Sequence, residues 1–74
     1  MPKLPNDLSG REVRAALERA GFMFSRQRGS HMILHRASSP ARIVVPDHKR
    51  VRVGTLKTII HEAGLTVEEF IGLL

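Results

Sequence analysis

Apolar residues recur at helical spacing near both ends of the chain, with shorter alternating runs between them. In the first segment, positions 13, 16, 17 and 20 are apolar, which gives the i, i+3, i+4, i+7 stripe of an amphipathic helix. Ser9 and Glu12 have the spacing of a capping box, and Gly21 follows the stripe as a typical helix stop. The pattern therefore predicts a helix between Ser9 and Gly21.

A second apolar stripe, over Leu56–Ala63, predicts another amphipathic helix that Gly64 ends. Thr66 and Glu69 then repeat the capping-box spacing. A short last helix, with Phe70 on its apolar side, is expected from there to the end of the chain.

The middle of the chain has the signals of short β-strands. Three runs are rich in β-branched, aromatic or alternating apolar residues, and turn-forming residues separate them. The expected strands are residues 22–28, 31–36 and 42–46, with turns at Gly29-Ser30 and at "ASSPA", residues 37–41. Short strands joined by such turns predict an antiparallel meander.

This order of elements, α-β-β-β-α with a short extra C-terminal helix, predicts an α+β fold. We expect one domain over residues 1–74, with residues 1–7 as a flexible arm and the helices on one face of a three-stranded antiparallel sheet. Double-stranded-RNA-binding domains share this order, which does not by itself assign a function. The buried face of the second strand stays open, because Ile33 lies on one face and Met32 and Leu34 on the other.

Composition narrows the class of partner. Twelve Lys and Arg against seven Asp and Glu leave a formal net charge of +5 on a small surface, which favours nucleic acid or an acidic protein. The chain has no cysteine, so we expect neither disulfides nor a thiolate zinc site, and no metal or other cofactor. No apolar run approaches the ~20 residues of a membrane span, so a soluble cytoplasmic protein is expected.

A histidine beside the first turn is the strongest candidate for chemistry. His31 follows Gly29 and Ser30, and Arg26 and Arg28 lie across the expected hairpin. A neutral imidazole there can take the proton of a ribose 2′-OH while cations stabilise charge on the phosphate. Such cleavage needs no metal, since the nucleophile belongs to the RNA. A polar strand residue without catalytic role is the alternative that spacing alone leaves open.

The segment "DHKRVRV", residues 47–53, is expected to be a basic loop. Lys49, Arg50 and Arg52 form a short basic run whose functional interpretation is phosphate contact, although a solvated loop is the plainer interpretation. His48, in the same loop, is either structural or a second proton-transfer group. Ser30, on the turn before His31, is a further candidate for phosphate binding.

Four stretches together resemble one family. They are "SGREVRAALERAGF", "RQRGSHMIL", "RIVVPDH" and "GTLKTIIHEAGLTVEEF". In this order and spacing they resemble the HicA (YcfA-like) mRNA interferase toxins of bacterial toxin–antitoxin systems. The resemblance implies a fold similar to double-stranded-RNA-binding domains, cleavage of mRNA as part of a stress response, and His31 as the catalytic histidine.

The resemblance also implies a partner, a HicB-type antitoxin of a type II system that binds the toxin and blocks its activity. Two other functions remain open at this point. The chain could be an RNA-binding module that never cleaves, or a protein-interaction domain for an acidic partner. Its oligomeric state is open as well.

Overall fold

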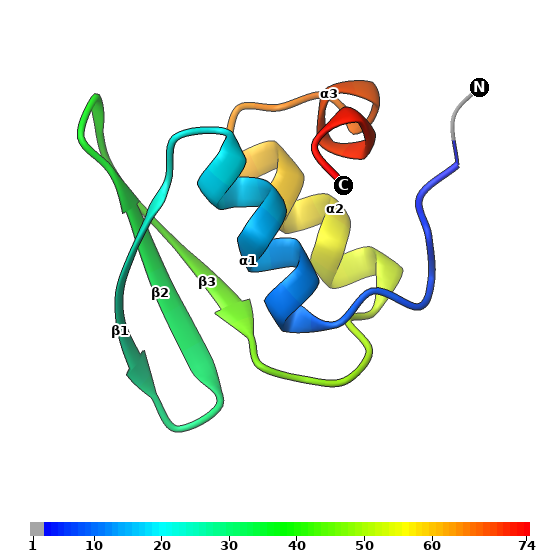
Figure 1. Cartoon of the computed structure of the whole chain (residues 1–74), viewed down its shortest axis with the longest axis horizontal. Helices are drawn as coiled ribbons and strands as arrows, with labels where there is room; N and C mark the ends of the chain where they lie inside the picture. Colours follow the sequence, from blue (N-terminus) through cyan, green and yellow to red (C-terminus); the bar gives the residue numbers. More distant parts are fainter. Residues whose placement is uncertain (1–2) are drawn as a thin grey trace.

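The computed structural model describes residues 3–74, and the side chains of all these except residues 39–41. Three antiparallel strands form a sheet in the order β1-β2-β3, and the helices lie over one of its faces (Figure 1). The elements are α1 (Gly10–Arg19), β1 (Met23–Arg28), β2 (His31–Arg36), β3 (Ser39–Pro46), α2 (Val53–Glu62) and α3 (Val67–Gly72). The predicted α+β fold and order of elements are confirmed.

Helix α1 begins and ends as its sequence predicts. The Ser9 hydroxyl accepts from the Glu12 amide at 3.1 Å, and the Glu12 carboxylate accepts from the Ser9 amide at 3.0 Å. At the other end Gly21 has a φ of +102°, and the Phe22 amide donates to the Leu17 carbonyl, which closes a Schellman motif. Because the Phe22 amide is used in this way, β1 starts one residue later than expected.

Helix α2 begins earlier than its apolar stripe suggests. It starts at Val53, so the basic loop spans residues 47–52 instead of reaching residue 53. Its end is again a Schellman motif, with Gly64 at a φ of +73° and the Leu65 amide donating to the Ile60 carbonyl. The expected capping box of Thr66 is present at the start of α3.

Alternation along β2 settles which face of the sheet is buried. Met32 and Leu34 belong to the core cluster beneath the helices, whereas Ile33 does not. Ile33 is nevertheless only 6% exposed on the opposite, helix-free face, since it lies on the central strand between its cross-strand partners Arg26 and Val44. We refer to this side of the sheet as the free face.

A β-bulge in β1 decides which of its residues reach the free face. Phe24 pairs with Leu34 on the core side, but Arg26 pairs with Ile33 because Ser25 is an extra residue in the ladder. Without this insertion, alternation would put Arg26 on the same side as Phe24. The bulge thus brings Arg26, and with it Arg28 opposite His31, onto the free face.

The start of β3 was predicted wrongly. The turn expected over residues 37–41 is limited to Ala37 and Ser38, and the strand runs from Ser39, which pairs with Arg36 across a shift in register. The proline at position 40 suggested a loop. In this sheet β3 is an edge strand, where a residue without an amide hydrogen is tolerated because one side of the strand makes no ladder bonds.

The N-terminus of α1 packs directly on the end of β3 and on the loop that follows. The Gly10 amide donates to the His48 carbonyl at 2.8 Å, and the Val51 amide donates to the Leu8 carbonyl at 2.7 Å. The Val51 side chain is buried in the core, and Arg50 donates from Nε to the Asn6 carbonyl at 2.6 Å. The backbone of the loop is therefore fixed to the segment that leads into α1.

This contact needs a glycine. A Cβ on Gly10 would collide with the carbonyl oxygen of Pro46 and lie 3.1 Å from the Cα of Asp47, both of them backbone atoms. A flexible side chain could move away, but here a strand end or a helix would have to shift.

We therefore expect Gly10→Ala to lower the free energy of unfolding by about 1–3 kcal/mol, the usual range for overpacking. Gly54→Ala is the matched control, because nothing lies within 4 Å of its added Cβ, and it lies in the first turn of α2. It should be neutral or stabilising by up to about 1 kcal/mol. Urea unfolding measures both, and equal stability of the two variants would contradict the close contact.

Candidate functional site

The β1–β2 turn presents His31 from a fixed backbone. Gly29 has a φ of +58° while Ser30 has no positive φ, which is the pattern of a type II′ turn. The Ser30 carbonyl accepts from the Asp47 amide at 2.6 Å, and Gln27 donates from Nε2 to the Gly29 carbonyl and to the Asp47 carboxylate, each at 3.0 Å. The turn is thus tied to the first residue after β3.

His31 lines a surface hollow of about 510 Å³. The start of β2, the end of β3, the basic loop and the first turn of α2 together form it. Its lining residues are His31, Val44, Pro46, His48, Arg50, Arg52 and Thr55. Two histidines and two arginines face this space, and no carboxylate is among the lining residues, so the hollow favours an anion.

Helix α2 adds to this positive character. Arg52 occupies its N-cap position and makes no side-chain capping hydrogen bond. The first amides of a helix have no partner within the helix and carry a partial positive charge. Since Arg52 and Thr55 both line the hollow, this end of α2 adjoins the same space as His31 and reinforces its preference for an anion.

The predicted phosphate ligands divide into three groups. Arg50 and Arg52 line the hollow with His31. Arg26 and Arg28 lie on the neighbouring strand of the free face, where Arg28 pairs with His31 in the ladder, and neither lines the hollow. Lys49 is exposed in the loop and is not a lining residue, and Ser30 is exposed on the turn.

Sequence reasoning named Arg52 only as part of the basic run, did not select Thr55, and left His48 undecided. The sequence does hold one signal for this part of the site: Val51 is an apolar residue between two arginines. Its burial anchors the loop and so fixes where Arg50 and Arg52 lie. Thr55 could be predicted as a lining residue only with the knowledge that α2 begins before its apolar stripe.

The other two histidines lie outside the hollow. His35 pairs with Arg42 near the other end of β2, and His61 is exposed in the last turn of α2. Over residues 3–74, no group of three or more His, Asp or Glu side chains is arranged to share a metal ion. No helix in that part of the chain has both the length and the apolar character needed to cross a membrane.

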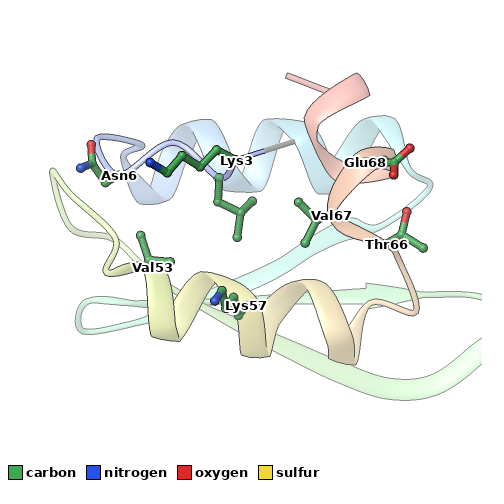
Figure 2. Close-up of a pocket in the computed structure, with 8 residues that line it drawn as sticks. Lys3, Asn6, Val53, Lys57, Thr66, Val67 and Glu68 are labelled. Atoms are coloured by element: carbon green, nitrogen blue, oxygen red, sulfur yellow. The ribbon is translucent and has the colours of Figure 1, made fainter. Parts of the chain in front are cut away.

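A second hollow, of about 550 Å³, lies on the other side of the start of α2. Figure 2 shows Lys3 and Asn6 of the N-terminal segment across from Val53 and Lys57 of α2. The start of α3 completes it; the full lining is Lys3, Leu4, Asn6, Val53, Lys57, Thr66, Val67 and Glu68. No histidine is among these residues, so this hollow lacks the proton-transfer group that distinguishes the first.

Comparison with known proteins identifies the family of the chain. A family model for the "HicA toxin of bacterial toxin-antitoxin" matches residues 10–65, a range that includes every residue lining the His31 hollow. None of the curated proteins compared with the chain matches it. The family match covers three quarters of the sequence, from the start of α1 to the Schellman motif of α2. The chain therefore belongs to the HicA family, the toxins of bacterial toxin–antitoxin systems.

Proposed function

We propose that this HicA-family chain is an endoribonuclease that cleaves mRNA without a metal ion, with His31 as its proton-transfer group. The observation that carries the proposal is the position of His31 on a fixed turn, at a hollow lined by cations and by no carboxylate. In this proposal the chain is the toxin of a type II toxin–antitoxin system, in keeping with its family.

The proposed reaction uses the RNA as its own nucleophile. The neutral imidazole of His31 accepts the proton of a ribose 2′-OH, and the 2′-oxygen attacks the adjacent phosphorus. The bond from phosphorus to the 5′-oxygen breaks, which leaves a 2′,3′-cyclic phosphate on one fragment and a 5′-OH on the other. Imidazole suits this role because its ordinary pKa allows both protonation states near neutral pH.

In this proposal, positively charged side chains bind the phosphates of the RNA substrate. Arg50 and Arg52, together with the first amides of α2, stabilise the negative phosphate in the hollow. Arg26 and Arg28 bind the RNA backbone farther along the free face, where they add affinity but no base selection. None of the three phenylalanines is fully exposed, so base stacking contributes little and binding should weaken as salt is raised.

The proposed partner is a HicB-type antitoxin that covers the free face and the His31 turn. Arginines surround an apolar centre on this face. The centre contains Ile33 and its neighbour Val44, together with Met23, which is 66% exposed. An apolar centre with arginines around it is the usual composition of a protein interface. Binding there would block access of RNA to the hollow.

We expect His31→Ala to reduce RNA cleavage roughly 100-fold or more, since general acid–base catalysis typically contributes that factor. RNA binding and the folded structure should persist, because His31 is exposed. His61→Ala is the matched control and should retain wild-type activity. The rate at which a labelled transcript is cleaved, with EDTA present, is measured for the wild type and for both variants.

Full activity of His31→Ala would refute its catalytic role. Activity that disappears with EDTA and returns with a divalent cation would refute the metal-independent mechanism. RNA binding without cleavage by the wild type would favour the non-catalytic RNA-binding module, and binding of an acidic protein but no RNA would favour an interaction domain.

For the antitoxin, charge complementarity should appear as fast association that slows as salt is raised. Stopped-flow mixing of toxin and antitoxin over a range of salt concentrations measures this rate, and a parallel assay follows RNA cleavage. A complex that leaves His31 open and cleavage unimpeded would exclude inhibition by occlusion.

A further inference from the structure

We infer that His48 is a second proton-transfer group, which protonates the leaving 5′-oxygen while His31 deprotonates the 2′-OH. The inference rests on the proposed RNA cleavage and adds a residue to it. It starts from the observation that the β1–β2 turn and the basic loop place two histidines at one hollow.

The fold keeps the two histidines close. His31 pairs with Pro46 across the β2–β3 ladder, and His48 is two residues beyond Pro46. Paired Cα atoms in an antiparallel sheet lie about 5 Å apart, and two extended residues add about 6.6 Å at most. The two Cα atoms are therefore within about 12 Å, which lets both imidazoles reach one phosphate group.

His48 has a fixed backbone and an exposed side chain. Its carbonyl accepts the Gly10 amide at 2.8 Å, and the preceding residue, Asp47, donates its amide to the Ser30 carbonyl. One end of this short segment is thus bound to the β1–β2 turn that carries His31, and the other end to the start of α1. A fixed backbone helps to hold a proton-transfer group in the orientation that its reacting atom requires.

Among the charged groups around His48, only the histidines of the hollow can exchange a proton. The charged or titratable groups that line it with His48 are His31 from β2, Arg50 from the loop and Arg52 at the start of α2. Asp47, the nearest carboxylate in sequence, is engaged by Gln27 at 3.0 Å and by Arg11 at 3.4 Å and does not line the hollow. Arginine does not release a proton in this pH range, so only the two imidazoles can exchange one.

The geometry of phosphoryl transfer makes two such groups useful. The attacking and leaving oxygens lie roughly in line on opposite sides of the phosphorus, so one imidazole cannot contact both in the same step. As the 2′-oxygen bonds to phosphorus, its proton passes to His31; as the bond to the 5′-oxygen breaks, His48 gives that oxygen a proton. When water opens the cyclic phosphate, His48 takes a proton from the water and His31 returns one to the 2′-oxygen, so both groups are restored.

The test compares two leaving groups. One substrate is an oligoribonucleotide whose cleavage site by the wild type has been mapped; the other is the same oligonucleotide with sulfur replacing the bridging 5′-oxygen at that site. A thiolate leaves without needing a proton. We expect His48→Ala and His48→Gln to slow cleavage of the oxygen substrate roughly 100-fold, yet to cleave the sulfur substrate within a few-fold of the wild-type rate.

The other variants separate this inference from the proposed function. His31→Ala should slow cleavage of both substrates, and His61→Gln should slow neither. The pH–rate profile of the wild type should be bell-shaped, and the His48 variants should lose the limb that reports the acid. Thermal unfolding of each variant verifies that it is folded.

Three results would overturn the inference. If the His48 variants cleave the oxygen substrate at the wild-type rate while His31→Ala does not, His48 has no role and the proposed function survives. If they slow both substrates equally, His48 binds RNA and does not donate a proton. If folded wild-type protein cleaves neither substrate, the proposed function itself fails, and this inference with it.

Discussion

The site depends on the close contact between the first residue of α1 and the last residue of β3. With no side chain on Gly10, the helix N-terminus reaches the backbone of Pro46 and Asp47 and bonds the carbonyl of His48. Pro46 lies opposite His31 in the sheet, and His48 follows it in the loop. This backbone contact between a helix and a strand therefore holds His48 directly, and it holds the strand end that pairs with His31.

The sheet contributes the second geometric requirement, through the extra residue in β1. Because Ser25 interrupts the ladder, Phe24 faces the core while Arg26 and Arg28 face the same side as His31. The charge of the free face is thus a consequence of register and not only of composition. The basic loop and α2 supply the remaining cations from the opposite edge, so the hollow lies between two sources of positive charge.

Much of this fold could be predicted because its signals are local. The capping boxes at Ser9 and Thr66, and the glycine stops at Gly21 and Gly64, lie within a few residues of the helix ends that they determine. The start of β3 could not be predicted in this way, since a proline is acceptable in that strand only because it lies at the edge of the sheet.

The site was predictable in part, for the same reason. His31 stood out because a turn and two arginines lie next to it in sequence, whereas Arg52 and Thr55 join it only through tertiary packing. The chemical end groups of the RNA products test the central claim most directly. The account predicts a 2′,3′-cyclic phosphate or its 3′-phosphate product, and a 5′-OH, when the wild type acts with EDTA present and the fragments are weighed by mass spectrometry. Fragments with a 5′-phosphate and a 3′-OH would contradict it, because those ends arise when water attacks the phosphorus and the 3′-oxygen leaves, a reaction that does not use the 2′-OH.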